Sequence, residues 1–151
     1  MRSTYRVLAG IIALGVVAQA SFVALGWFLT LNEIDDGQLV DKAYLENDGW
    51  NIGHTLHGIV GFNLMPLLGL ILLIVSFFAK IPGGVKWAGL TFLAIIVQVV
   101  LGLLAFGVGG LGALHGINAF VVLGLALFTG RRVAMTTSAT TSTEKPEAAA
   151  V

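Results

Sequence analysis

The chain has no cysteine and little charge, since only 11% of its 151 residues are Asp, Glu, Lys or Arg. Without cysteine it can form no disulfide, thiolate metal site, iron–sulfur cluster or covalent c-type haem link. Any metal would therefore need histidine or oxygen ligands. What the chain does contain is apolar: 57% of its residues are hydrophobic and its mean hydropathy is +0.95. This composition lies far outside soluble usage and indicates an integral membrane protein.

The chain contains four long apolar segments, which we expect to cross a membrane at about 7–31, 52–78, 87–106 and 114–128. Charged residues separate the first three, and a glycine-rich connection without charge, 107–112, separates the third from the fourth. The first is longer than the apolar part of a secretory signal and is interpreted as a retained anchor. Pro66 lies inside the second and predicts a kink. The fold class is thus all-α: an integral membrane four-helix bundle over residues 1–132. A low-complexity tail at 133–151 is expected to be disordered and cytoplasmic.

The cations are distributed unequally between the two sides of this arrangement. Lys42 lies on one side, beside the acidic loop 32–51, and the other seven Lys and Arg lie on the opposite side. The positive-inside rule then places both termini in the cytoplasm and the acidic loop outside. We expect a multi-pass protein of the bacterial plasma membrane. The acidic loop lacks the spacing and central glycine of a calcium loop, and a short helix is expected near 39–45.

Two of the three histidines begin a repeated phrase: HGIVGF starts at His57 and HGINAF at His115. Both phrases lie near the outer start of an out-to-in span, so the two imidazoles are expected at equal depth. Each half of the chain also has the same in-to-out and out-to-in order of spans. We interpret this as an internal two-fold repeat of helical hairpins, with a site formed between the repeats.

Small residues accompany both histidines on the same helix face. Residues three and four apart share a face, so Gly61 lies beside His57 and Gly112 lies beside His115. An imidazole next to a residue without a side chain leaves a flat recess in the helix wall. Such a recess suits the edge of a porphyrin with one imidazole on each side of the iron.

The sequence therefore predicts one b-type haem between the second and fourth helices, with the two repeated histidines as its metal ligands. The deeper Phe62 and Phe120 are expected to line the ring. Each ligand histidine needs a partner for its second ring nitrogen. The backbone carbonyls one turn earlier, those of Gly53 and Leu111, are the candidates.

Other interpretations of the histidines remain open. Small residues also line ordinary helix contacts in membranes, which fits a cofactor-free structural or accessory subunit. His54 lies at the end of a span, where it could be an interfacial residue, a haem-propionate partner or an alternative ligand. A third interpretation has His54, His57 and His115 together bind copper or zinc.

Three polar residues lie inside the apolar segments: Gln19, Asn63 and Gln98. Hydrogen bonding between helices is their expected role, with contact to a quinone as the alternative for Asn63 and Gln98. No Asp or Glu lies within a span, which argues against a proton pump or ion-coupled transporter based on intramembrane carboxylates. Met65 lies more than two turns deeper than His57 and is expected to pack rather than bind iron.

Residues 52–132 resemble one four-helix half of the haem A synthase family. The HTLHG phrase from His54 is similar to that family's motif of Glu, two residues, His and Arg. The QVVLG phrase from Gln98 resembles its third-helix pattern, and ALH ending at His115 resembles its fourth-helix ligand. The resemblance implies that His57 and His115 are axial haem ligands. The chain also resembles small four-helix bacterial membrane proteins with a single bundle.

The chain departs from this family at positions that matter for its chemistry. His54 stands where the family has Glu, Gly58 stands where it has Arg, and the second bundle and the loop cysteine pair are missing. We therefore expect no haem A synthase activity, and more generally a non-enzymatic role in electron transfer or haem handling. The expected partners are membrane lipid, a redox partner or quinone, and further copies of the chain, but not nucleic acid.

Overall fold

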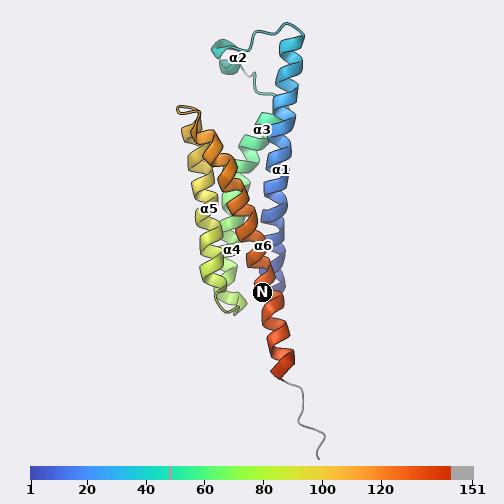
Figure 1. The fold of residues 1–151 in the computed structure, drawn as a ribbon, viewed down its shortest axis with the longest axis vertical. Helices are drawn as coiled ribbons and strands as arrows, with labels where there is room; N and C mark the ends of the chain where they lie inside the picture. The colour runs from blue at the N-terminus through green and yellow to red at the C-terminus, as the bar shows by residue number, and fades with distance from the viewer. Residues whose placement is uncertain (48, 144–151) are drawn as a thin grey trace, which may run out of the picture.

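The computed structural model describes residues 1–47 and 49–143, and every regular element within these residues is helical. The elements are α1 (Arg2–Asp35), α2 (Lys42–Glu46), α3 (Ile52–Ile59), the π-helical segment η1 (Val60–Leu64), α4 (Met65–Ala79), α5 (Gly84–Ala105) and α6 (Leu111–Thr143). Figure 1 shows the long helices side by side, with α2 in a loop at one end.

Four helical stretches are long and apolar enough to cross a membrane: α1, the continuous stretch Ile52–Ala79, α5 and the Leu111–Arg132 part of α6. For the described residues, the prediction of an all-α fold with four helices able to span a membrane is thereby confirmed. Helix α6 continues to Thr143, well beyond the expected end of the fourth span at residue 128. It therefore includes the first part of the segment expected to be a disordered tail, whose residues 144–151 lie outside the described residues.

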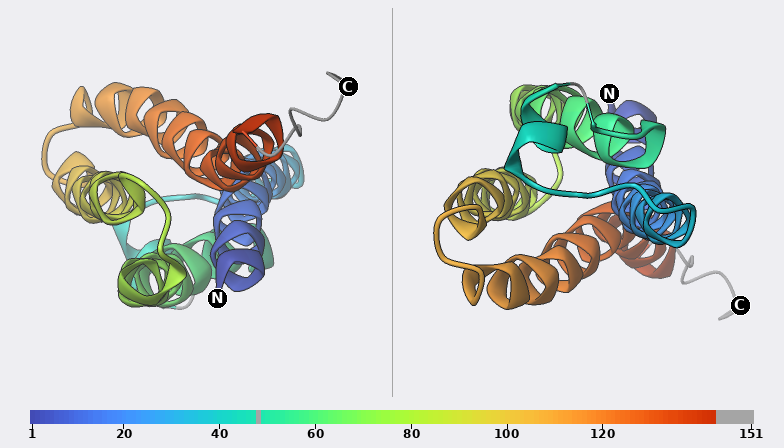
Figure 2. Two further views of the ribbon diagram at one scale, coloured as in Figure 1. Left: turned by 90° about the horizontal axis from the view of Figure 1, so that it is seen from below. Right: turned by 90° about the horizontal axis from the view of Figure 1, so that it is seen from above.

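The helices form a four-sided bundle in which α1 packs against α4 and α6, and α5 packs against the same two helices. The second and fourth spans therefore lie diagonally across the bundle from each other. At the α2 end, α3 packs on α1. Figure 2 shows this pair on one side of the bundle and the connection between α5 and α6 on the other. The start of α1 and the α4–α5 turn lie at the opposite end (Figure 1).

Small side chains dominate the contacts between helices. The buried residues include alanines from all four spans: Ala9, Ala13, Ala79, Ala88, Ala94 and Ala126. Lipid is as apolar as a protein core, so helices associate in membranes through close packing rather than through hydrophobic burial. Helices α1 and α3 approach each other closely at two glycines, since a Cβ added to Gly53 would lie 2.2 Å from the backbone nitrogen of Gly26. Only glycine allows this backbone-to-backbone contact.

Pro66 explains the π-helical segment in the second span. Its ring nitrogen has no hydrogen, so the carbonyl of Phe62 loses its usual helical donor. In the preceding turn the N–H of Met65 donates to the carbonyl of Val60, five residues back. The irregularity expected at Pro66 therefore takes the form of a π-helical turn, η1, inserted between α3 and α4.

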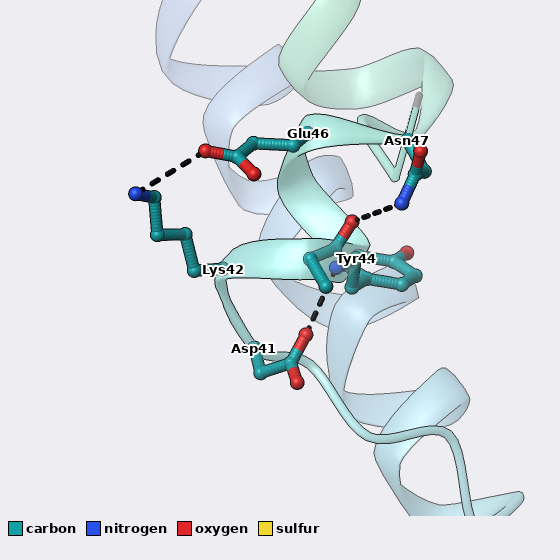
Figure 3. Close-up of polar contacts among 6 residues, drawn as sticks. Asp41, Lys42, Tyr44, Glu46 and Asn47 are labelled. Carbon is teal, nitrogen blue, oxygen red and sulfur yellow. Dashed lines mark hydrogen bonds and ion pairs between the residues drawn. The ribbon is translucent and has the colours of Figure 1, made fainter.

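The acidic loop is locally ordered around α2 (Figure 3). Asp41 caps the helix by accepting a hydrogen bond from the backbone N–H of Tyr44 at 2.9 Å. Lys42 pairs with Glu46 one turn later, and the side chain of Asn47 donates to a backbone carbonyl of the same helix. These contacts place α2 slightly later than the short helix expected near 39–45.

A side-chain hydrogen bond ties this loop to the end of α1. The Tyr44 hydroxyl donates to the Glu33 carboxylate. This bond raises the pKa of Tyr44 above its ordinary value, with burial and the negative charge of Glu33 acting in the same direction. The bond therefore joins the loop to the C-terminal end of α1.

Candidate functional site

His57 of α3 and His115 of α6 face each other across the bundle. Their ring centres are 6.0 Å apart and their planes are inclined by 70°. Both side chains are half-buried. The two residues lie on spans that are diagonal across the bundle.

Each histidine is oriented by a backbone carbonyl of the helix beside it. Nδ1 of His57 lies 3.3 Å from the carbonyl oxygen of Gln19, and Nδ1 of His115 lies 2.9 Å from that of Gln98. A carbonyl can only accept, so Nδ1 is the protonated nitrogen in both rings and Nε2 keeps its lone pair. Within the described residues no hydrogen bond occupies either Nε2 atom.

These partners differ from the expected ones. The carbonyls of Gly53 and Leu111, one turn before each histidine, were the wrong candidates. Each imidazole points away from its own helix and towards the helix packed beside it. The rings instead reach across to carbonyls of the neighbouring helices α1 and α5.

Amide side chains join the same helices around the two histidines. Gln19 donates from Nε2 to the carbonyl of His57 at 3.1 Å, and Asn118 donates to Oε1 of Gln98 at 2.8 Å and to the carbonyl of Ala94 at 2.9 Å. The expected role of Gln19 and Gln98 between helices is confirmed. Asn118 was missed, although it lies three residues after His115 and so shares its face.

Asn63 does not join two helices. Its side chain is exposed and donates to the carbonyl of Ile59 in its own helical turn at 3.0 Å. The expectation that it bonds across the bundle is therefore wrong, because the position faces outward. Because the Asn63 side chain points outward, its orientation does not support contact with a quinone inside the bundle.

The glycines beside the histidines act differently from the prediction. A Cβ on Gly61 would lie 2.6 Å from Nε2 of Gln19, so the Gln19 side chain already fills the space that was expected to be a recess. Gly112 is exposed, and a Cβ added to it would meet only the Cβ of Ala105, at 4.0 Å. The glycine that clears space for the His115 imidazole is Gly102, where a Cβ would lie 3.1 Å from that ring.

Phe62 and Phe120 do not line the pair of histidines. They are 57% and 76% exposed. Five residues along a helix correspond to a rotation of about 140° beyond one full turn, so a phenylalanine at this spacing points away from the face of its histidine. The expectation that they border a ring is corrected by this rotation.

His54 belongs to a separate contact at the outer end of α3. Its ring packs against Gly26, where a Cβ would lie 2.7 Å from it, and stands edge-on to Trp50 at 5.6 Å. Trp50 in turn meets Phe106 at 6.2 Å, linking α3 to the end of α5. Among the described residues no three His, Asp or Glu side chains gather as a metal-binding group. The three-histidine copper or zinc site is therefore not formed.

Met65 packs as expected. It is buried, and its sulfur lies over Gly15 of α1, where a Cβ would be only 2.6 Å away. It fills a gap between α1 and α4 two turns below the histidines.

Comparisons of the chain with protein-family models, with curated proteins and with solved structures found no match. Function is therefore argued from the geometry and chemistry of the site itself.

Proposed function

We propose that the chain is a membrane protein that holds one b-type haem between His57 and His115 and acts in electron transfer or haem handling. The observation that carries the proposal is the opposed pair of imidazoles, each with Nδ1 bound to a carbonyl and Nε2 unoccupied. This is the arrangement that metal-bound histidines adopt, with the outer nitrogen oriented by a backbone partner.

The separation of the rings fits one metal ion between them. A metal ion held by both Nε2 atoms would lie about 2 Å from each, which requires the ring centres to lie within about 6 Å of each other. The ring centres of His57 and His115 are 6.0 Å apart. Only two histidines meet here and there is no thiolate, which favours haem iron, whose porphyrin supplies the other ligands, over a bare ion.

The haem would supply reversible one-electron chemistry when bound. The chain's own residues determine how that chemistry is used. His57 and His115 would hold the haem iron, and the carbonyls of Gln19 and Gln98 keep both imidazoles in the tautomer that can ligate. The resemblance to one half of a haem A synthase supports haem holding, whereas His54 in place of that family's Glu does not favour synthase activity.

The two histidines use equivalent partners, which supports an internal repeat of two hairpins. In each half, a Gln in the first span offers its backbone carbonyl to the histidine of the second span. We infer from this correspondence that the two hairpins are related by duplication, with the haem site at their junction.

Charge distribution supports an orientation in the bacterial plasma membrane. Within the described residues, the cations at one end of the bundle are Arg2, Arg6, Lys80, Lys86, Arg131 and Arg132, whereas every Asp and Glu falls in residues 33–46 at the other end. With the cationic end cytoplasmic, both termini lie inside and the haem lies nearer the outer surface.

The experiment is an absorption spectrum of the purified chain reconstituted with haem, taken oxidised and then reduced with dithionite. Sharp low-spin bands are expected in the wild type and are lost in His57→Ala and in His115→Ala. Asn63→Ala is the matched control, because that side chain is outward and bonds only within its own helix. Low-spin bands that survive both histidine substitutions would refute the proposal.

A cofactor-free accessory subunit is the second candidate, favoured by the way Gln19 fills the space beside Gly61. In that case His57 and His115 contribute only to helix packing. A colourless protein after reconstitution, with unchanged stability in both histidine variants, would favour it.

A further inference from the structure

The two histidines are held unequally, although their partners correspond. His115 lies 2.9 Å from its carbonyl, and His57 lies 3.3 Å from its own, near the long end of hydrogen-bond distances. The difference continues into the side chains around them.

The network at His115 is complete. Asn118 donates both to Oε1 of Gln98 and to the carbonyl of Ala94. The side chain of Gln98, whose backbone carbonyl binds the His115 ring, is therefore itself held by a hydrogen bond. Gly102 brings the backbone of α5 against the His115 ring. Helix α6 also packs against both α5 and α1.

The network at His57 is incomplete. Gln19 donates to the His57 carbonyl, but its Oε1 atom is buried without a hydrogen-bond partner among the described residues. The position that matches Asn118 in the repeated phrase is Val60, which has no side-chain donor to offer. A buried acceptor without a donor costs free energy and favours rearrangement of the group that carries it.

The backbone around His57 is also less regular. His57 lies on α3, which has eight residues, and the π-helical segment η1 begins three residues after it. A π-helical turn offers an alternative helical register, and such turns occur frequently at functional sites. A return to α-helical pairing at η1 would rotate α3 relative to α4 and so change the contacts of His57.

From these differences we infer that His115 is the permanent axial ligand and that His57 yields its position to a small neutral ligand such as carbon monoxide or free imidazole. This inference rests on the proposed haem site. With His57 displaced, the haem iron would have one coordination position for such a ligand, whereas two fixed histidines would leave none.

The first experiment compares His57→Ala with His115→Ala, both reconstituted with haem. His57→Ala is expected to keep its haem, bind carbon monoxide in the ferrous state and regain a low-spin spectrum with added imidazole. His115→Ala is expected to retain haem at least about tenfold more weakly. His54→Ala is the control for loss of a histidine outside the pair. Equal retention in the two variants, or stronger retention by His115→Ala, would overturn the inference.

A milder pair of variants covers the case in which a histidine variant does not fold. Gln19→Leu removes a contact of His57, and Asn118→Leu removes the donor that completes the His115 network. Gln19→Leu is expected to speed carbon monoxide binding, and Asn118→Leu is expected to weaken haem retention. The reverse assignment of these two effects would count against the inference.

The difference in how firmly the His57 and His115 rings are oriented, here called the unequal hold, is also measurable without haem. In ¹⁵N NMR of the haem-free chain, neutral His115 is expected in a single Nδ1–H tautomer and neutral His57 in exchange between tautomers. Two equally fixed rings, or a more fixed His57, would overturn this inference while leaving the proposed function standing. A wild-type chain that binds no haem would overturn the proposed function, and the NMR comparison would still test the unequal hold.

Discussion

Replacing Gly53 by alanine tests the role of the α1–α3 contact in holding His57. The new Cβ would lie 2.2 Å from the nitrogen of Gly26 and 2.7 Å from the carbonyl oxygen of Phe22. Ordinary contacts are about 3.5 Å, so the helices must separate by about 1 Å. Both obstacles are backbone atoms and cannot rotate away.

This separation would break the two contacts between α1 and His57. They are 3.3 Å and 3.1 Å long, and an added ångström exceeds hydrogen-bonding distance. Overpacking costs about 1–3 kcal/mol, and each lost bond between membrane helices costs about 0.6 kcal/mol. The higher helix propensity of alanine returns about 0.5–1 kcal/mol. The net destabilisation expected for Gly53→Ala is about 1.5–3.5 kcal/mol by this arithmetic.

The assay is reversible unfolding in detergent micelles followed by circular dichroism, together with the haem spectrum. Gly58→Ala is the matched control, since Gly58 lies on the same helix next to His57 and an added Cβ would meet nothing within 4 Å. It is expected to be neutral or slightly stabilising. If Gly53→Ala and Gly58→Ala agree within about 0.5 kcal/mol, the reasoning about the α1–α3 contact is refuted.

Three further predictions follow from the contacts of single residues. Gly61→Ala drives a Cβ to 2.6 Å from the side-chain nitrogen of the α1 glutamine, and is expected to lower thermal stability and weaken haem binding; unchanged values would contradict the packing described. Because the chain lacks cysteine, Asp36→Cys should react with an impermeant maleimide in intact cells, and Ser3→Cys only after permeabilisation; the opposite pattern would reverse the orientation. Tyr44 is expected to titrate above its ordinary pKa in NMR, and Glu33→Gln should lower that pKa. Because the pKa of Tyr44 is raised in the folded chain, the Tyr44–Glu33 bond stabilises the fold fully at pH below the ordinary tyrosine pKa, and this stabilisation is lost as the pH rises through the raised pKa. A Tyr44 pKa unchanged by Glu33→Gln would exclude the bond.

The four spans were predictable because each is a long run with few charges, and length alone then requires a helix. The meeting of His57 and His115 followed from a repeated phrase at equal depth in matching spans. The four spans and the shared depth of the two histidines depend only on the order of residues along the chain, so they can be deduced without knowing how the helices pack.

The details of the site depend on packing between helices, which the sequence does not specify. Gly61 could be placed beside His57, but only the position of α1 shows that Gln19 fills the adjoining space. The carbonyl partners likewise come from neighbouring helices. The outward position of Phe62, by contrast, follows from the helical repeat alone, which places a residue five positions after His57 off the histidine face.

Electron paramagnetic resonance of the oxidised, haem-reconstituted chain tests the central claim most directly. Two imidazole ligands are expected to give a low-spin ferric signal, which converts to a high-spin signal in His57→Ala and returns to low spin when imidazole is added. A wild-type chain that gives only a high-spin signal, or no haem signal at all, would contradict the assignment of His57 and His115 as paired iron ligands.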